Sequence, residues 1–512
     1  MATDVLIGQA YFLRFDPSLW SAQRPYAPLG ALYAAAFVRD AGHRVAVFDA
    51  MLAESEAEWA TALDQHQPRV AVLFEDSFNY LSKMCLLRMR QAALTMIGAA
   101  QDRGIPVLVA GSDATDHPAL YLNAGAAAVI AGEGEVTLVL AVEALTRGTD
   151  LAALDGVVVR RGDGLLRTTP RPIMRDLDSA PRPAWDLIDV ERYRTIWLRR
   201  HGSFSMNLAT TRGCPYHCNW CAKPIYGQRY TARGAVAVAD EIAWLKASYR
   251  PDHLWITDDI FGLKPGWTAA FADALAARDA VTPFKCLMRA DNVTREVVAD
   301  LRRAGCQTVW IGAESGSQRI LDAMEKGTRV EQIETAAALL HNAGIEVCFF
   351  LQFGYPGETL ADIERTLAMV ARCRPDDIGI SVSYPLPGTP FHARVRDQLG
   401  EKQNWQDSAD LDVMYRASHA PAFYRALHAY VHARFRIARG IDALRGGPTL
   451  SRLGLRARFA LAVAGAASAV RLPAAWRRMR RLAQDVPDRA PTPALVPLLT
   501  PQAAAVPTDQ AH

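Results

Sequence analysis

Short apolar runs alternate with longer amphipathic segments through the first 145 residues of the chain. Residues 4–8 form a continuous apolar run, which is typical of a buried strand. Residues 28–42 repeat apolar side chains at helical spacing and end at a glycine, a common helix terminator. The alternation predicts further strands at 45–49, 69–74, 105–111 and 127–132, and a helix at 86–103. It indicates an α/β fold in which helices wrap a parallel, Rossmann-like sheet.

The same alternation resumes over residues 204–385, with six strand–helix repeats. The predicted strands are 205–210, 253–257, 284–289, 308–312, 346–351 and 378–382. The predicted helices are 236–248, 266–278, 294–304, 317–324, 330–343 and 359–372. Six repeats are too few for a complete eight-stranded barrel, so we predict a partial (β/α)₆ barrel. Its site should lie at the carboxyl ends of the strands.

The remaining segments follow other patterns. The prolines at 170, 172, 181 and 183 exclude helix from the segment between the two repeating regions. Two helical stretches, 422–439 and 453–483, follow the barrel, and the last residues are rich in Pro and Ala without periodicity. We therefore predict a Rossmann-like domain at 1–148, a linker at 149–203, a partial barrel at 204–390, a helical domain at 391–485 and a disordered tail at 486–512.

The basic stretch 453–483 admits two interpretations. Arginines surround an apolar core at 459–470, which is too short to span a bilayer. Such a helix can lie on an anionic membrane surface, which would place the chain at the inner face of a membrane and favour a lipid-like substrate. Alternatively, it is a solvated helix that closes the barrel bottom or contacts a partner protein.

Composition narrows the function classes. A net charge of +3 over 512 residues argues against a nucleic-acid partner. The first residues run directly into a strand-like segment, so no signal peptide is expected, and no uninterrupted apolar segment reaches membrane-spanning length. The eight cysteines then indicate a reducing cytoplasm and not a disulfide framework.

Three of those cysteines, Cys214, Cys218 and Cys221, stand in a C-x₃-C-x₂-C spacing. Thiolates that close in sequence converge on one point and select zinc or an iron–sulfur cluster. Zinc would need a fourth ligand, which His217 could supply. A [4Fe–4S] cluster held by three cysteines would keep one iron open. The other cysteines, at 85, 286, 306, 348 and 373, are expected to be buried apolar residues.

Gly213-Cys-Pro-Tyr-His-Cys-Asn-Trp-Cys221 resembles the signature of the radical S-adenosylmethionine (SAM) enzymes. The resemblance implies that the open iron of a [4Fe–4S] cluster chelates SAM, that an electron from a flavodoxin- or ferredoxin-type donor cleaves it, and that a 5′-deoxyadenosyl radical results. Trp220 matches the aromatic residue that precedes the third cysteine and would shield the cluster from water.

The resemblance also assigns residues at the predicted strand ends to SAM. Asp258 and Asp259 would lie near its methionyl end, although an aspartate there is also a common helix cap. Glu314 and Ser315, in a Gly-x-Glu-Ser-Gly motif, would contact the ribose hydroxyls. The other expected SAM residues are Arg289, which could instead form a salt bridge at the barrel rim, and Gly354 and Gly357, which would let the backbone approach the adenine. The loop 384–390 would face the substrate.

Residues 1–148 resemble the cobalamin-binding domain that precedes the radical module in many family members. The Pro-Leu-Gly start of helix 28–42, the Ala-Gly-His-x-Val turn at 41–45 and Gly-Glu-Gly-Glu at 132–135 carry this resemblance. The D-x-H-x-x-G motif is absent, so no histidine from it would lie below the cobalt. The implied cobalamin contacts are Leu29, Gly30, Ser77, Gly111, Ser112, Gly132, Glu133 and Gly134. A scaffold domain without cobalamin is the alternative.

Together these features predict a radical SAM enzyme that uses cobalamin for C-methylation of an unactivated carbon in a small-molecule or lipid-like metabolite. Two alternatives stay open. The same parts can support ring formation, as in the anaerobic magnesium-protoporphyrin ester cyclases. Alternatively, the chain is a zinc-bound interaction protein on a Rossmann-like scaffold.

Overall fold

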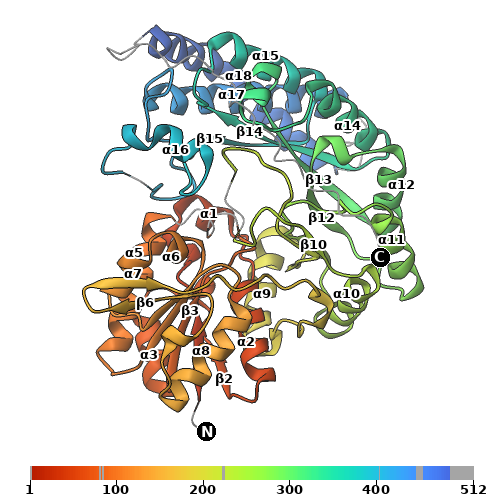
Figure 1. Cartoon of the computed structure of the whole chain (residues 1–512). Coiled ribbons are helices and arrows are strands. Elements are labelled where there is room, and N and C mark those ends of the chain that lie inside the picture. Colours follow the sequence, from red (N-terminus) through yellow and green to blue (C-terminus); the bar gives the residue numbers. More distant parts are fainter. Residues whose placement is uncertain are drawn as a thin grey trace, which may run out of the picture.

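The computed structural model describes residues 3–79, 82, 86–221, 225–402, 404–445 and 454–484. Within these residues the strands form a seven-stranded sheet, a six-stranded sheet and a two-stranded ribbon. Figure 1 shows the first sheet with its helices, in red and orange, beneath the arch of the second, in yellow to blue-green. The predicted α/β class is confirmed.

The first sheet has the strand order β2-β1-β3-β4-β5-β6-β7. Five strands are parallel: β1 (Val5–Gly8), β2 (Val45–Val47), β3 (Val70–Phe74), β4 (Val107–Ala110) and β5 (Ala128–Ile130). One apolar core lies under α2 (Leu29–Asp40) and α8 (Glu135–Arg147), and the other under α3 (Ala57–His66) and α5 (Leu87–Gln101). The strand order reverses at β1, so a ligand crevice is expected at the carboxyl ends of β1 and β3.

Two antiparallel strands, β6 (Val157–Arg161) and β7 (Gly164–Arg167), complete this sheet. They fall in the segment 149–203 that the sequence predicted as a linker. Val157, Val158 and Val159 are buried, and pairing with β5 satisfies their backbone groups. The N-terminal sheet therefore extends into the predicted linker. A helix, α9 (Val190–His201), ends that segment.

The second sheet is an entirely parallel half-barrel with the order β15-β14-β13-β12-β11-β8. Its six strands confirm the predicted partial barrel. They are β8 (Ser205–Leu208), β11 (His253–Ile256), β12 (Phe284–Met288), β13 (Cys306–Glu314), β14 (Glu346–Phe353) and β15 (Asp377–Val382). The outer helices are α10 (Ala235–Tyr249), α11 (Trp267–Ala277), α12 (Arg295–Ala304), α13 (Gln318–Ala323), α14 (Val330–Asn342) and α15 (Leu360–Cys373).

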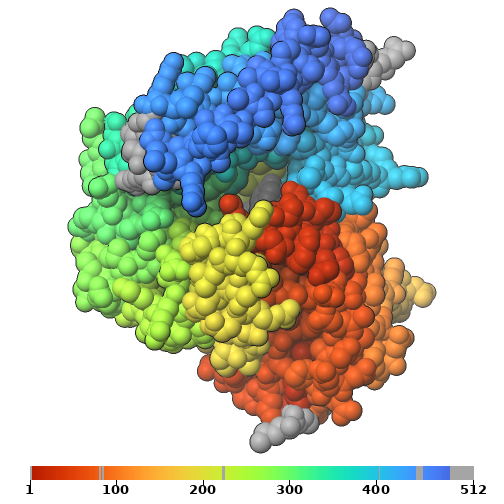
Figure 2. Space-filling model, turned by 180° about the vertical axis from the view of Figure 1, so that it is seen from behind, coloured from red at the N-terminus to blue at the C-terminus, as the bar shows by residue number. Residues whose placement is uncertain are grey.

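The concave face of the half-barrel is more exposed than its outer face. In β12, for example, Phe284, Cys286 and Met288 are buried, whereas the alternate residues Lys285 and Leu287 are only half-buried. The concave face carries aromatic side chains, and Figure 2 shows a hollow on this side of the molecule between the two modules. Its half-buried or exposed residues include Trp255, Lys285, Trp310, Phe350 and Ser381.

Two long helices follow the half-barrel, after the short α16 (Pro390–Val395). These are α17 (Pro421–Arg445) and α18 (Leu455–Gln484), and they agree with the predicted helical stretches. They pack against each other along the upper surface in Figure 2, where they are blue. The predicted disordered tail, 486–512, lies outside the described residues, as does Cys85.

Candidate functional site

The three-cysteine loop leaves the half-barrel at the carboxyl end of β8. A small antiparallel ribbon, β9 (Thr211–Arg212) and β10 (Thr231–Ala232), brackets it. Gly213, with φ of 80°, begins the loop, and a Cβ there would lie 2.2 Å from the Arg229 carbonyl oxygen. Only glycine fits this position, because both the backbone angle and the contact exclude a side chain.

Asp258 anchors the base of this loop. Its carboxylate accepts hydrogen bonds from the backbone N–H of Thr210 (2.7 Å) and Thr211 (3.0 Å), and from the Thr210 hydroxyl. Burial raises the pKa of Asp258 to about 6, although these hydrogen bonds oppose the shift. Asp258 was predicted to contact SAM, but in the structure its side chain points to the loop backbone. Asp259, the other aspartate of the pair, is half-buried. Burial of the Cys214 thiol raises its pKa, and the Asp259 charge adds a smaller rise.

A buried amide fixes the middle of the loop. Asn219 donates its backbone N–H to the Met324 carbonyl and its side-chain amide to the Ala323 carbonyl, both at the end of α13. The Tyr355 hydroxyl donates to the Asn219 side-chain oxygen at 2.9 Å. Asn219 therefore holds the segment between the second and third cysteines against the half-barrel.

Two buried cations face the cysteine loop. The Arg289 guanidinium forms a two-pronged pair with Asp291, lies 3.6 Å above the Tyr216 ring, and approaches the Cys218 sulfur to 3.9 Å. Lys326 donates to Glu314 Oε1 at 2.9 Å and lies over the Trp220 ring. Burial lowers the pKa of Lys326, but Glu314 and Cys218 outweigh it and raise the pKa overall. These cations suit a loop that must carry negatively charged thiolates.

Lys326 was not predicted from the sequence. It follows α13 in a Glu-Lys-Gly turn, and lysines in such turns are usually exposed. Only the fold brings it to Glu314 and the cysteine loop, so residue type and spacing carried no signal for it.

The two polar residues of the Gly-x-Glu-Ser-Gly motif point in different directions, one toward the cysteine loop and the other toward α15. Glu314 has a left-handed backbone with φ of 56° and turns toward Lys326. Ser315, by contrast, is fully buried, and its hydroxyl lies 3.2 Å from the Thr366 hydroxyl on α15. Glu314 therefore belongs to the group beside the cysteines, whereas Ser315 secures the turn to a helix.

The two predicted adenine-site glycines lie at the end of β14. A Cβ on Gly354 would lie 3.2 Å from the Tyr424 ring of α17, so this glycine permits close packing of the C-terminal helix. Its N–H donates to Glu358 at 2.6 Å. The Gly357 carbonyl accepts from Arg319 at 2.9 Å. The following loop, 384–390, lines a cavity of about 420 Å³ between the two modules, together with Asp113, His117 and His392.

The donor set of the loop fits an iron–sulfur cluster. All three cysteines are free thiols on one loop beside two cations. His217, the fourth ligand that a zinc site would need, is exposed. Among the described residues, no group of three or more His, Cys, Asp or Glu side chains is arranged to hold a metal ion, so the convergence of the three thiolates on one point stays a prediction.

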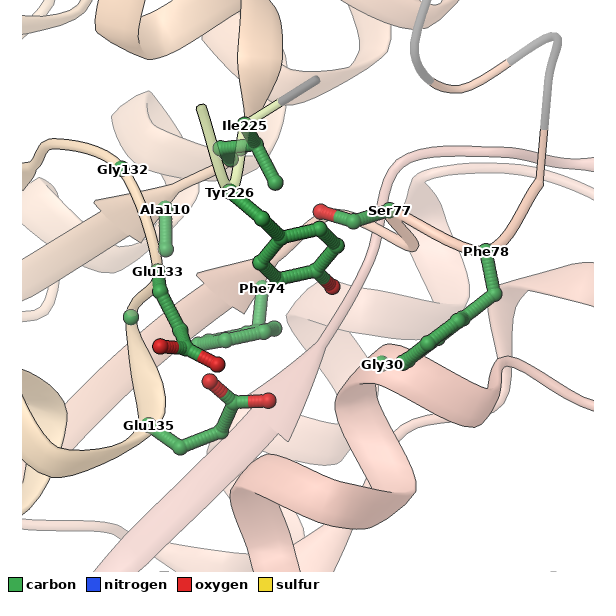
Figure 3. Close-up of a pocket in the computed structure, with 12 residues that line it drawn as sticks. Gly30, Phe74, Ser77, Phe78, Ala110, Gly132, Glu133, Glu135, Ile225 and Tyr226 are labelled. Atoms are coloured by element: carbon green, nitrogen blue, oxygen red, sulfur yellow. The ribbon is translucent and has the colours of Figure 1, made fainter. Parts of the chain in front are cut away.

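A second cavity, of about 280 Å³, lies at the carboxyl ends of the first sheet (Figure 3). Six predicted cobalamin contacts line it: Gly30, Ser77, Gly111, Gly132, Glu133 and Gly134. Leu29 and Ser112 do not line it, and Leu29 is buried in the core instead. The other lining residues are Phe74, Phe78, Ala110, Glu135, Ile225 and Tyr226.

Ile225 and Tyr226 come from the loop after the third cysteine and project into this cavity (Figure 3). These two side chains form the side of the cavity that faces the cysteine loop. Gly132 leaves the wall of the cavity open, because a Cβ there would meet only the Ile225 carbonyl oxygen, at 3.8 Å. Gly111 and Gly134 instead permit close packing, since a Cβ on them would lie 2.7 Å from Glu75 and 2.9 Å from Phe74. The residues around this cavity would hold a corrinoid at the carboxyl ends of the first sheet, beside the cysteine loop.

A buried ion network at the edge of this cavity joins the two modules. Arg212, directly before the cysteine loop, pairs with Glu133 and with Glu135 at 2.7 Å, and all three side chains are buried. The Arg212 guanidinium also lies over the Tyr33, Phe78 and Tyr226 rings. Glu133, predicted as a cobalamin contact, thus also positions the cysteine loop.

Below the cavity, Glu75 is a buried carboxyl that changes charge near neutral pH. Its Oε1 accepts from the Ala10 N–H at 2.9 Å, while Oε2 has no hydrogen-bond partner among the described residues. Burial raises its pKa from 4.5 to about 8. The shift means that the ionised carboxylate is destabilised in the folded protein by at most roughly 5 kcal/mol relative to the unfolded chain. A raised carboxyl pKa stabilises the fold at low pH, and this contribution is lost as pH rises from about 4.5 to about 8.

Glu75→Gln removes this ionisation. Relative to the wild type, the variant is expected to gain thermal stability between about pH 5 and about pH 9, measured as the difference in melting temperature. Glu401→Gln, at an exposed position, is the control and should track the wild type. A constant difference between Glu75→Gln and wild type across this range would contradict the assignment.

Comparison with known proteins agrees with both sites. The description "Radical SAM superfamily" matches residues 208–370, and "B12 binding domain" matches residues 20–142. The chain is a radical SAM enzyme with a B12-binding domain. The enzyme's cofactors are a [4Fe–4S] cluster, SAM and cobalamin.

Curated relatives extend the similarity across both domains. The enzyme is 24% identical to an uncharacterised methyltransferase of Pyrococcus horikoshii, over 77% of its own chain and 83% of the relative. It is 26% identical to an anaerobic magnesium-protoporphyrin IX monomethyl ester cyclase of Synechocystis, over 62% of each chain. It is also 26% identical to the hopanoid C-3 methylase of Methylococcus capsulatus, over 72% of its own chain and 69% of the relative.

Solved structures share the fold. The methyltransferase TsrM from Kitasatospora setae, solved with cobalamin and a [4Fe–4S] cluster, superposes with a TM-score of 0.63 at 21% identity, over 78% of this chain and 75% of that one. The cobalamin-dependent enzyme OxsB gives a TM-score of 0.68 at 17% identity, over 90% and 70%. The enzyme thus has the domain arrangement of these proteins.

Proposed function

We propose that the enzyme transfers a methyl group from SAM to an unactivated carbon of an apolar, lipid-like substrate. The aromatic concave face of the half-barrel is the observation that carries the substrate class. The Trp310 and Phe350 rings stack there at 4.6 Å, and Phe350 is 37% exposed although it lies in the middle of a strand. At the other edge, Tyr26 packs against Trp255 at 4.4 Å. Such a lining favours rings or chains without charge.

The relatives support this class. One is named a methylase of hopanoids, and another is named a methyltransferase. Lys285 is a cation on the concave face, but it is compatible with an apolar substrate. Its ammonium group donates a hydrogen bond to the Tyr26 hydroxyl at 2.9 Å and lies over the Trp255 ring. The substrate would therefore meet mainly aromatic surface.

In this proposal, Cys214, Cys218 and Cys221 hold the cluster. When bound, the cluster would supply the electron that cleaves SAM into methionine and a 5′-deoxyadenosyl radical, and cobalamin would carry the methyl group taken from a second SAM. Asp259, Arg289, Glu314 and Lys326 offer charged partners for the amino, carboxylate and ribose groups of SAM. Asp258 and Ser315 act indirectly, by holding the cysteine loop and the Glu314 turn.

The cavity in Figure 3 would hold cobalamin next to the cysteine loop. Gly132 would let the macrocycle approach the backbone, and Tyr226 would contact it from the loop that follows the third cysteine. The reductant would be a flavodoxin- or ferredoxin-type protein, and the chemistry requires a reducing compartment such as the cytoplasm.

The test uses enzyme loaded anaerobically with iron, sulfide and cobalamin, a reduced flavodoxin as electron donor, SAM carrying a deuterated methyl group, and a neutral-lipid extract of the source organism. We expect 5′-deoxyadenosine, S-adenosylhomocysteine and a lipid that has gained the labelled methyl group. Label only in polar products would overturn the lipid class, and absence of label transfer from every fraction would overturn methylation.

Ring formation is a second candidate, favoured by the similarity to the Synechocystis cyclase. The same experiment separates the two activities. A cyclase would form 5′-deoxyadenosine and a product with fewer hydrogens, and the label would stay out of that product.

A further inference from the structure

The outward face of α18 carries large apolar side chains in contact with water. Leu455, Phe459, Val463 and Val470 recur at helical spacing, and Phe459 and Val470 are 72% and 83% exposed. Leu444 on α17 is exposed beside them. Contiguous exposed apolar side chains of this size mark an interaction surface.

The same helix is strongly basic. Its thirty residues, 455–484, include no aspartate or glutamate. Trp476, 46% exposed, stands where the apolar stripe meets the basic C-terminal half. The arginines are Arg456, Arg458, Arg471, Arg477, Arg478, Arg480 and Arg481. An apolar stripe, an aromatic residue and flanking arginines form the pattern of a helix that lies in the interface of an anionic bilayer.

The inner face of α18 is fixed to the rest of the molecule. At its crossing with α17, a Cβ on Gly465 would lie 3.1 Å from Gly440, so the two backbones touch. Arg458 donates to the Ala443 carbonyl at 2.8 Å. Ser468 and Met479 are buried on this inner side. Packing against α17 therefore determines which residues face outward.

The helix pair is also tied to the edge of the half-barrel. Arg439 of α17 pairs with Asp376 at 2.9 Å, just before β15, and Tyr424 packs on Gly354 after β14. Helix α17 therefore runs from the carboxyl end of the strands to their amino end. Helix α18 is antiparallel to it and runs back toward the carboxyl end. The basic half of α18 thus lies toward the end of the half-barrel that holds the cysteine loop.

By length and composition alone, α18 is apolar enough to cross a membrane. This differs from the expectation from the sequence that no segment reaches membrane-spanning length. One such helix is weak evidence that the chain crosses a membrane. Its inner face packs on α17, and Arg471 and Pro473 interrupt the apolar stretch. These features favour a helix lying along a surface over one passing through it.

We propose that the outward face of α18, with Leu444, docks the enzyme on the surface of an anionic phospholipid bilayer. The apolar stripe would enter the acyl boundary, and the arginines would meet phosphate groups. Docking by this face would bring the active-site end of the half-barrel close to the bilayer. Binding of this kind needs no cofactor, so its failure would leave the proposed methyl transfer untouched.

The test is co-sedimentation of the full chain with vesicles of phosphatidylcholine alone, or mixed equally with phosphatidylglycerol. We expect binding to the mixed vesicles that weakens with salt, and little binding to the neutral ones. Phe459→Ser with Val470→Ser should weaken binding about tenfold or more. Arg477→Gln with Arg481→Gln should also weaken it about tenfold at low salt.

Val236→Ser with Leu198→Ser, at exposed apolar positions elsewhere, is the matched control and should bind as the wild type does. Circular dichroism would verify that each variant is folded. Absence of binding to the mixed vesicles, or unchanged binding of both α18 variants, would overturn the proposal. So would a lipid-free dimer that the α18 substitutions abolish, because the face would then belong to a second copy.

Discussion

Cys218→Ser is expected to leave the chain folded but without its iron–sulfur cluster. The wild type, loaded anaerobically, should contain about four irons per chain, and the variant should contain less than about one. Serine removes one of three thiolates that a cluster with an open iron cannot spare. Folding should survive, because the loop is held by contacts from other residues, among them Asp258 and Asn219.

The same loss is expected for Cys214→Ser and Cys221→Ser, together with loss of 5′-deoxyadenosine formation. Cys373→Ala is the matched control, since this cysteine lies at the end of α15, remote in sequence from the loop. It should keep the iron and the activity of the wild type. Normal iron content in any of the three loop variants would remove that cysteine from the ligand set.

Arg212→Met is expected to produce the largest loss of stability among single substitutions outside the core. It leaves the buried carboxylates Glu133 and Glu135 without their cation, and breaking a buried pair in this way costs about 3–5 kcal/mol. Because Arg212 directly precedes the cysteine loop, we also expect poorer incorporation of iron. Melting temperature and iron content measure the two effects.

Two further variants make this prediction specific. Adding Glu133→Gln and Glu135→Gln to Arg212→Met removes the uncompensated charges and should recover much of the melting temperature. Arg39→Met, which breaks an exposed pair with Asp186, should cost less than about 1 kcal/mol. Equal effects of Arg212→Met and Arg39→Met would contradict the role of Arg212 as the link between the domains.

Periodicity sufficed to predict most of the fold. The six barrel strands were predicted because each is a short apolar run between amphipathic helices, so local pattern and tertiary structure agree. The five parallel strands of the first sheet were also predicted from short apolar runs. Its last two strands, β6 and β7, fall in the segment that was predicted as a linker. The run Val157–Val159 lies in this segment, and its pairing with β5 is a tertiary contact that periodicity does not encode.

Spacing and glycine content were enough to locate two parts of the candidate site, the three-cysteine loop at the end of β8 and the glycine-bearing loops that line the cavity of the first sheet. The site was less predictable where the direction of a side chain decides its role. Asp258 and Asp259 are adjacent, yet only the fold shows that Asp258 turns to the backbone of Thr210. Ser315 likewise turns to Thr366, 51 residues away.

Long-range ion pairs were the least predictable part. Glu133 and Arg212 lie 79 residues apart in sequence and in different domains. Lys326 meets Glu314 only because β13 and the turn after α13 come together. Neither pair has a sequence signal, because its energy depends on burial that residue type does not reveal.

The central claim is that one iron of a three-cysteine cluster stays open for SAM. Electron paramagnetic resonance of the reduced, iron-loaded chain, recorded with and without SAM, tests it most directly. The account predicts a reduced [4Fe–4S] signal that changes when SAM is added, because its amino and carboxylate groups bind the open iron. A signal that SAM leaves unchanged, or a chain that takes up zinc in place of iron, would contradict it.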